Sequence, residues 1–146
     1  MNILVSACLL GIRCRYDGDS NFCPQLETLL QHHHLIPVCA EQLGGLPTPR
    51  VPAERRGETI VTRDGGDVTT QFTAGAQEVL RLAKIYRCEM AILKARSPSC
   101  GHGTIYDGTF THTVTEGDGV TAALLREHGI PVYTEHDLKT LQLDCD

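Results

Sequence analysis

The sequence predicts an α/β fold of three layers, Rossmann-like, with helices on both faces of a mainly parallel sheet and a small β-hairpin insertion. Short apolar runs alternate along the chain with segments of helical periodicity. Their order is strand, helix, strand, hairpin, helix, strand, helix, strand, helix, which is typical of a parallel sheet. The 146 residues contain no internal repeat, and they suffice to bury a core without disulfides. We therefore expect one domain over residues 1–146.

Four short apolar runs are predicted to form the sheet. Each is rich in β-branched or aliphatic residues and too short for a buried helix. Pro37 weakens the second run, because proline lacks the N–H that a central strand donates. The four runs are residues 3–7, 35–39, 90–93 and 131–133, and the hairpin is expected from residues 59–62 and 67–70 around the 64–66 turn.

Four segments are predicted to be helices. Pro24 suits a first helical turn, and Leu26, Leu29 and Leu30 follow at helical spacing. Gly129 is placed to end another helix in the C′ position. The four helices are expected at residues 24–34, 72–87, 120–128 and 136–143.

Two long loops interrupt this pattern and are candidates for functional segments. Residues 40–57 are rich in glycine and proline, and residues 94–119 are rich in glycine, serine and threonine. Loops of this length in compact domains are usually functional or disordered. The second loop is expected to contain a β-ribbon around residues 109–115.

Composition narrows the possible functions. The net charge of −5 argues against a protein that coats DNA or RNA by charge alone. The N-terminal residues lack the basic region of a signal peptide, and no apolar run is long enough to span a membrane. We therefore expect a cytoplasmic protein in a reducing compartment, where its seven cysteines are more often ligands or catalysts than disulfides.

Three cysteines are expected at one edge of the sheet. Cys8 follows the first strand, Cys39 ends the second, and Cys100 lies in the loop after the third. Ligand sites of open parallel sheets lie beyond the carboxyl ends of the strands. Cys8 and Cys39 taken singly are equally well explained as small buried hydrophobic residues, whereas Cys100 sits in a polar loop with little core to fill.

The residues alone leave three chemistries open at this edge. Zinc would need a fourth ligand, which His102 could supply. An iron–sulfur cluster on three cysteines would leave one iron open to bind a substrate. A catalytic nucleophile would pair Cys100 with His102 as its base, in a cysteine hydrolase or transferase.

Several motifs resemble those of a known family. They are residues 6–11 (SACLLG), 15–18 (RYDG), 37–41 (PVCAE), 44–50 (GGLPTPR), 97–101 (SPSCG), 105–110 (IYDGTF) and 117–122 (GDGVTA). Together they look like the bacterial thiouracil desulfidase family, and the resemblance spans nearly the whole chain. Ala40 departs from the pattern, because proline is common between that cysteine and the following glutamate.

The resemblance implies a cofactor and a reaction. It implies a [4Fe–4S] cluster held by the three matching cysteines, Cys8, Cys39 and Cys100, with one iron left open. The implied reaction is the non-redox desulfuration of a thiolated pyrimidine, such as 2- or 4-thiouracil or 4-thiouridine, to its oxo form. Family members that act on tRNA carry an additional domain. Since this chain is acidic and has no such domain, a small thionucleobase or nucleoside is favoured over tRNA. No dinucleotide or NTP-binding motif occurs.

A general base is needed to activate water for attack on the carbon that bears the sulfur. Glu41 is the candidate, because it lies two residues beyond Cys39 on the same edge. Ser97 or Ser99 is expected to relay a proton or to bond the pyrimidine, and the sequence does not separate them.

Five further residues are candidates for substrate binding. Tyr16 could stack on a flat base, with packing against its own loop as the equal alternative. Arginine side chains suit phosphate or carbonyl groups, but here they could equally pair with nearby carboxylates. Asp118 could hold a substrate group at a helix N-terminus or simply cap that helix. The five candidates are Tyr16, Arg15, Arg50, Arg96 and Asp118.

The other cysteines are interpreted as structural or incidental: Cys14, Cys23, Cys88 and Cys145. Cys14 alone lies in a loop that could approach the site. The histidines at 32–34 are expected to complement a helix C-terminus. From a different class of protein, a metal-bearing module that binds thionucleobases without turnover remains the alternative to an enzyme.

Overall fold

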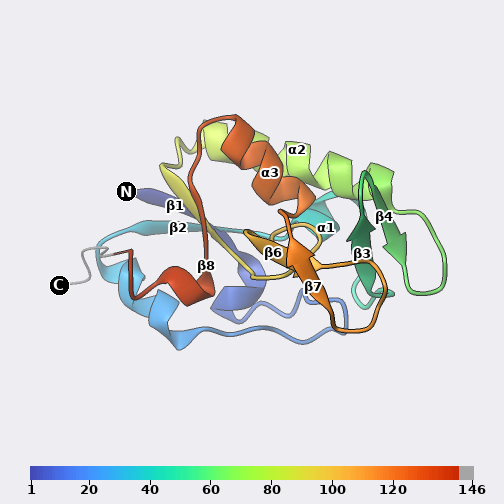
Figure 1. Ribbon diagram of the computed structural model, residues 1–146. Helices are drawn as coiled ribbons and strands as arrows, with labels where there is room; N and C mark the ends of the chain where they lie inside the picture. Colours follow the sequence, from blue (N-terminus) through green and yellow to red (C-terminus); the bar gives the residue numbers. More distant parts are fainter. Residues whose placement is uncertain (142–146) are drawn as a thin grey trace.

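A four-stranded parallel sheet forms the centre of the molecule, as Figure 1 shows. The computed structural model describes residues 1–141. The strands are β1 (Asn2–Ser6), β2 (His34–Val38), β5 (Met90–Leu93) and β8 (Val132–Thr134), in the order β2-β1-β5-β8. All three pairings in this sheet are parallel. The predicted α/β class with a mainly parallel sheet is confirmed.

Strand β1 is covered on both faces, because its side chains alternate between two apolar clusters. Leu4 belongs to one cluster, and Ile3 and Val5 belong to the other. All three side chains are fully buried. Burial on both faces explains why this segment reads as a continuous apolar run rather than an alternating one.

Three α-helices cover the Leu4 face: α1 (Ala40–Leu43), α2 (Thr69–Ile85) and α3 (Val120–Glu127). The predictions for residues 72–87 and 120–128 are therefore confirmed to within a few residues. Gly129 has a φ of 79° directly after the α3 C-cap, as expected for a C′ glycine. Within residues 1–141, none of the helices has the length and apolar character needed to cross a membrane.

The opposite face packs against 3₁₀ helices rather than α-helices. They are η1 (Ala7–Leu10), η2 (Pro24–Gln31) and η3 (Glu135–Asp137). Two of them lie where the sequence predicted longer helices, at residues 24–34 and 136–143. In η2, Leu26 and Leu29 are buried while Leu30 is exposed. Burial at i and i+3 fits three residues per turn, so the short apolar spacing does not require an α-helix. The predicted helix at 136–143 shortens to η3, and its last two residues lie outside the described part of the chain.

Two antiparallel hairpins differ in register from the prediction. Strand β4 (Thr59–Thr62) pairs with β3 (Ala53–Arg56), while Thr69 already begins α2. Only one bridge joins Val61 to Asp67, in the segment expected to form the second strand. The 109–115 ribbon is replaced by β6 (Thr104–Tyr106) paired with β7 (Val114–Glu116), so residues 107–113 form its loop. The glycine-rich turn at 64–66 misled the prediction, because Gly57 supplies the hairpin turn at a φ of 58°.

Helix α1 contacts α2 through two glycines that allow the backbones to touch. A Cβ on Gly75 would collide with the carbonyl oxygen of Ala40, and a Cβ on Gly44 would collide with that of Gln71. Because α1 starts immediately after Cys39, this backbone contact fixes where β2 delivers that cysteine.

We expect Gly75→Ala to destabilise the protein by about 3 kcal/mol, because the added methyl group must push two backbones apart. Chemical denaturation measures this loss. Gln77→Ala, at an exposed position of the same helix, is the control and should change stability by less than about 0.5 kcal/mol. Equal stability of the two variants would contradict the close-contact interpretation.

Candidate active site

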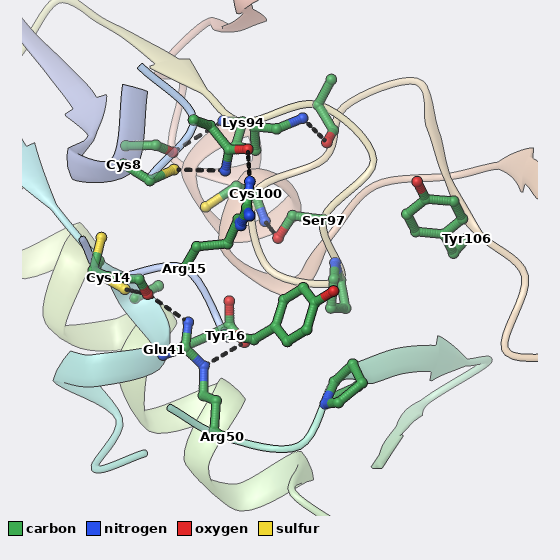
Figure 2. A pocket seen from close by; sticks show the side chains of 18 of the residues that line it. Cys8, Cys14, Arg15, Tyr16, Glu41, Arg50, Lys94, Ser97, Cys100 and Tyr106 are labelled. Carbon is green, nitrogen blue, oxygen red and sulfur yellow. Dashed lines mark hydrogen bonds and ion pairs between the residues drawn. The ribbon is translucent and has the colours of Figure 1, made fainter. Parts of the chain in front are cut away.

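A cavity of about 330 Å³ lies beyond the carboxyl ends of β1, β2 and β5. Its walls come from the loops that follow these strands and from both hairpins. Figure 2 shows the side chains that point into it. Open parallel sheets place their ligand sites at this edge.

Three cysteines from three separate segments line this cavity: Cys8, Cys39 and Cys100. Cys8 lies in η1 directly after β1, and Cys39 is the N-cap of α1 directly after β2. Cys100 lies in the 94–103 loop after β5. The structure therefore brings together the three thiols that the strand ends indicated.

Cys14 is a fourth thiol at the cavity, and the sequence interpretation had set it aside. Its side chain is 2% exposed. The Cys39 thiol donates to the backbone carbonyl oxygen of Cys14 at 3.8 Å. The only sequence signal was its position in the loop after the first strand. Cys23 and Cys88 are not among the residues that line the cavity, and Cys145 lies outside the described residues.

The four thiols differ in acidity. The Cys14 hydrogen bond, aided by Asn21 and Lys94, lowers the pKa of Cys8 to about 7 against the effect of burial. A hydrogen bond with Cys14, aided by the backbone of Gln42 and the charge of Arg50, lowers the pKa of Cys39 to about 6. Giving these bonds raises the pKa of Cys14 itself. Burial raises the pKa of Cys100 to about 12. Two of the thiols are therefore readily available as thiolates, the form that binds metal.

Glu41 lines the same cavity from the first turn of α1 and is held there by Arg50. The Arg50 Nε donates to Glu41 Oε1 at 3.3 Å, and its Nη2 donates to the carbonyl oxygen of Cys14 at 2.9 Å. Its Nη1 bonds the carbonyl of Pro47 and the hydroxyl of Thr48. The Arg50 side chain is 6% exposed, and its N–H groups donate to other protein groups. It positions Glu41 and the Cys14 loop rather than reaching freely toward a substrate.

The structure separates the two candidate serines. Ser97 lines the cavity, and its hydroxyl accepts hydrogen bonds from the backbone N–H groups of Ser99 and Cys100 at 3.1 and 3.0 Å. Ser99 is 1% exposed, bonds Thr121 Oγ1 at 2.7 Å and is not a lining residue. Ser97 is thus the serine in reach of a bound molecule, while Ser99 anchors the loop to α3.

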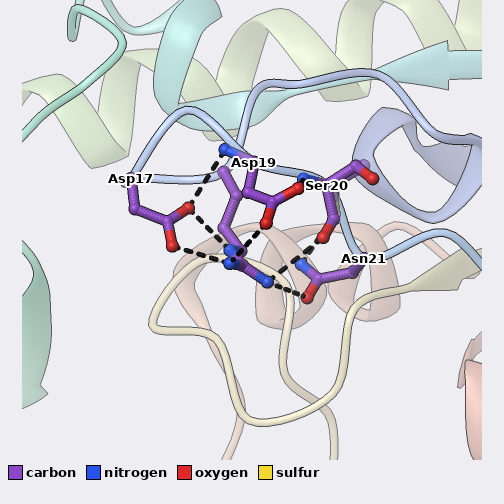
Figure 3. Close-up of polar contacts among 6 residues, drawn as sticks. Asp17, Asp19, Ser20 and Asn21 are labelled. Carbon is purple, nitrogen blue, oxygen red and sulfur yellow. Dashed lines mark hydrogen bonds and ion pairs between the residues drawn. The ribbon is translucent and has the colours of Figure 1, made fainter.

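Arg15 organises its own loop, in which Figure 3 labels Asp17, Asp19, Ser20 and Asn21. Its guanidinium forms a two-bond ion pair with Asp17 at 2.7 and 2.6 Å and also donates to Ser20 and Asn21. Asn21 in turn donates to Cys8 Sγ at 3.4 Å. The loop therefore supports Cys8 and leaves Tyr16, which is 44% exposed, at the wall of the cavity.

Arg96 and Asp118 do not line the cavity. Arg96 is exposed and has a φ of 67°. Asp118 accepts from His102 Nδ1 at 2.8 Å, from the backbone of Gly103 at 3.0 Å and from Arg126 at 2.7 Å. These bonds fasten the Cys100 loop to the start of α3. His102 therefore faces Asp118, which weakens the Cys100–His102 pair considered from the sequence.

The sequence interpretation did not single out several other cavity residues, because they come from segments far apart in the chain. Lys94 forms an ion pair with Glu135 at 3.0 Å, and its backbone N–H donates to the hydroxyl of Ser6. The β6–β7 hairpin contributes Tyr106 and His112, whose rings meet edge to face at 6.4 Å between centroids. The remaining lining residues include Arg63 and Glu54.

Glu54 fastens the two hairpins together at the cavity. Its Oε1 accepts hydrogen bonds from the backbone N–H groups of Gly108 and Phe110 at 3.0 and 3.1 Å. The neighbouring Arg56 donates to the carbonyl oxygen of Gly108 at 2.7 Å. The 107–113 loop, next to Tyr106 and including His112, is thereby held by β3.

Glu54→Ala should loosen this loop, because two backbone N–H groups lose a carboxylate partner at a cost of about 2 kcal/mol. We expect limited proteolysis within residues 107–113 to be faster by roughly tenfold, as local opening becomes easier. Glu58→Ala, at an exposed position on the same hairpin, should leave the rate unchanged. Equal protection in both variants would show that Glu54 does not hold the loop.

The donor set fits an iron–sulfur cluster. Within residues 1–141, no group of three or more His, Cys, Asp or Glu side chains is arranged to hold a single metal ion. The ligands of a cluster need not converge on one point, because its cysteines bind separate iron atoms. Three thiols that line one cavity, two of them with a lowered pKa, fit such a ligand set.

The fold and the site together define an α/β protein with a cysteine-lined cavity at the carboxyl edge of its sheet. Comparison with known proteins identifies it further. The family model of 2-thiouracil desulfurase matches residues 3–137, so the chain belongs to that family.

Two relatives cover nearly the whole chain. The solved structure of the [4Fe-4S]-dependent thiouracil desulfidase TudS superposes with a TM-score of 0.91 at 48% identity, over 96% of this chain and 94% of that one. The uncharacterized protein YbbK of Bacillus subtilis (strain 168) is 43% identical over 95% of this chain and 99% of its own length.

Proposed function

We propose that this protein is an iron–sulfur-dependent desulfidase that converts thiolated pyrimidines of the thiouracil type to their oxo forms. The observation that carries this proposal is the meeting of Cys8, Cys39 and Cys100 at one cavity beside the Glu41 carboxylate. Membership in the 2-thiouracil desulfurase family and the similarity to TudS support it. The reaction adds water and releases sulfide, which makes the enzyme a hydrolase or lyase rather than an oxidoreductase.

Cys8, Cys39 and Cys100 would hold a [4Fe–4S] cluster. When bound by three cysteines, such a cluster offers one iron without a protein ligand as a Lewis acid for a soft thiocarbonyl sulfur. The protein contributes the thiolates and the side chains that move protons. Arg50 and Lys94 add positive charge near the thiolates, which favours their deprotonated form.

The chemistry balances without electron transfer. A water molecule forms a new C–O bond to the carbon that carries sulfur, the C–S bond breaks, and the sulfur leaves as hydrosulfide. Glu41 accepts a proton from the attacking water, and Ser97 relays a proton or bonds the ring. Arg50 holds the Glu41 carboxylate toward the cavity through the 3.3 Å bond, so the base is oriented before the substrate arrives.

The cavity favours a small substrate. The cavity of about 330 Å³ would have to hold the proposed cluster together with the substrate, which favours a small molecule. Tyr16 at its wall offers a ring on which a flat base can stack. The protein's negative charge and the small cavity favour a free thionucleobase or nucleoside over tRNA.

Anaerobic preparation should give a brown protein with about four iron and four sulfide per chain. Cys8→Ser, Cys39→Ser and Cys100→Ser should each lose most of this iron, because one ligand is removed. Cys23→Ser, in a thiol away from the cavity, is the matched control and should keep full iron. If Cys8→Ser retains full iron and full turnover of thiouracil, the proposed ligand set is wrong.

Glu41→Gln should keep the cluster and lower kcat by about 100-fold or more, because the amide fits the same space but accepts no proton. Release of uracil from 2- and 4-thiouracil, followed by chromatography under anaerobic conditions, measures this. Glu58→Gln removes the same charge from an exposed position and should leave kcat unchanged. Full activity of Glu41→Gln would exclude Glu41 as the base. Binding of thiouracil without any uracil from the wild-type protein would instead favour a non-catalytic binding module.

A further inference from the structure

Lys94 places a cation in the wall of the cavity, at the point where β5 ends. It is the first residue after the strand, and its backbone N–H donates to the Ser6 hydroxyl at 3.0 Å. Ser6 is the buried last residue of β1. The backbone of Lys94 is therefore tied to two strand ends. Figure 2 shows this lysine among the lining residues, together with Cys8 and Cys100.

The ammonium of Lys94 is held by a carboxylate that follows the neighbouring strand β8. Glu135, the first residue of η3, pairs with Lys94 Nζ through Oε2 at 3.0 Å. Its Oε1 accepts from the backbone N–H of Ala95 at 2.7 Å. Nζ also donates to the Ala95 carbonyl oxygen at 3.1 Å. Both side chains of the pair are partly buried, so the ammonium has a defined place at the cavity.

One N–H of this ammonium is left for a molecule in the cavity. A lysine ammonium carries three N–H donors. Among the described residues, 1–141, only Glu135 and the Ala95 carbonyl accept from Lys94 Nζ. Anchoring of the loop does not need the ammonium, because Glu135 Oε1 already bonds the Ala95 N–H. A donor that is fixed but not fully used is the kind of polar group that orients a ligand in a cavity.

The other cations that line the cavity are placed differently. Arg50 and Arg15 donate to carboxylate and carbonyl groups of their own loops. The guanidinium of Arg63 lies over the Phe110 ring, 5.8 Å from its centroid, on the side of the hairpins. Of these cations, Lys94 alone directly follows a strand of the central sheet. It therefore stands at the same sheet edge as the proposed cluster ligands.

The thiouracils offer this donor an acceptor at a constant position. In both 2- and 4-thiouracil, ring atom N3 joins the thiocarbonyl carbon to a carbonyl carbon. A donor at one distance from the sulfur site thus meets a carbonyl oxygen in either isomer. When water makes the thiocarbonyl carbon tetrahedral, the N3 lone pair conjugates with the carbonyl alone, and the carbonyl oxygen becomes a stronger acceptor. A cationic donor at this oxygen therefore binds the transition state more tightly than the ground state.

Resting on the proposed function, we propose that Lys94 is a specificity-determining residue whose ammonium donates a hydrogen bond to the ring carbonyl oxygen of the thiopyrimidine. Glu135 is the positioning residue that holds the ammonium at the cavity. The site thereby selects thiopyrimidines that carry a carbonyl oxygen across N3 from the sulfur. An analogue without this oxygen leaves a partly buried charge without its partner, which is how a polar site rejects a ligand that lacks one group.

The test compares each thiouracil with an analogue that lacks only the carbonyl oxygen. The pairs are 4-thiouracil with pyrimidine-4-thione and 2-thiouracil with pyrimidine-2-thione. The preference within a pair is the ratio of the two kcat/KM values or, for an analogue that is not turned over, the ratio of its inhibition constant to the KM of the thiouracil. Because each preference is compared between wild type and variant, differences in the intrinsic reactivity of the compounds cancel.

Lys94→Met removes the charge and the donors while keeping an unbranched side chain, and Glu135→Gln weakens the hold on the ammonium. Lys84→Met removes the same charge from an exposed position of α2 and is the matched control. Each protein is prepared anaerobically, assayed for iron and sulfide, and checked for folding by circular dichroism before its preferences are measured.

We expect Lys94→Met to hold the wild-type amount of iron and to lose kcat/KM for both thiouracils by roughly 10- to 100-fold, because a charge-assisted hydrogen bond is lost. Its preference for the thiouracils should fall by about tenfold or more, since the analogues never make this bond. Glu135→Gln should lower the preference by a smaller factor, and Lys84→Met should leave it unchanged.

A wild-type preference in loaded Lys94→Met would overturn the inference, because the lysine would then act on all four compounds alike. Loss of iron from folded Lys94→Met would overturn it as well, since the lysine would then support the cluster rather than the substrate. If Lys94→Met does not fold, Glu135→Gln decides, and an unchanged preference in that variant overturns the inference.

The wild-type protein separates these failures from failure of the proposed function. If the wild type releases uracil from neither thiouracil, the proposed function is wrong, and the Lys94 inference is overturned with it. If the wild type desulfurates the thiouracils and the variants keep its preference, only the role of Lys94 is refuted.

Discussion

Parallel pairing of β1 with β2 and with β5 is the constraint on which the site depends. Ser6 pairs with Val38, and Val5 pairs with Ile92, so the three strands end at nearly the same level. Because the strands run in one direction, residues that follow them in sequence meet at one edge. Cysteines far apart in the chain thereby reach one cavity. The cavity would not survive a change in this topology, since its cysteine-bearing walls begin at the strand ends.

Hydrogen bonds and ion pairs of charged side chains hold the loops that follow the strands. Arg50 joins the Glu41 carboxylate to the Cys14 carbonyl, and Arg15 binds the loop that carries Asn21 to Cys8. On the far side, Asp118 fastens the Cys100 loop to α3. Buried or half-buried arginines that satisfy several acceptors at once make these loops rigid. A rigid donor set suits a cofactor whose ligands must stand at fixed positions.

Much of this arrangement could be predicted from the sequence. The succession of strands along the chain and the strand-end positions of Cys8 and Cys39 follow from local patterns, because apolar runs and breakers indicate buried strands directly. The roles of Arg15, Arg50 and Asp118 could not be read in this way, since whether a charged side chain faces a ligand or a neighbouring carboxylate is decided by tertiary contacts. Cys14 was missed for the same reason. The 3₁₀ form of η2 and the pairing of β3 with β4 depended on which of several similar turns the packing selects.

Desulfuration by water, with Glu41 as the base, is the central claim of this account. The most direct test is turnover of thiouracil by the anaerobically loaded protein in water enriched in ¹⁸O, with mass spectrometry of the uracil and an assay of the released sulfide. The account predicts one ¹⁸O atom in each uracil, one sulfide released per uracil, and no need for an added reductant or oxidant. Uracil without the label, or turnover that requires an external electron donor, would contradict it.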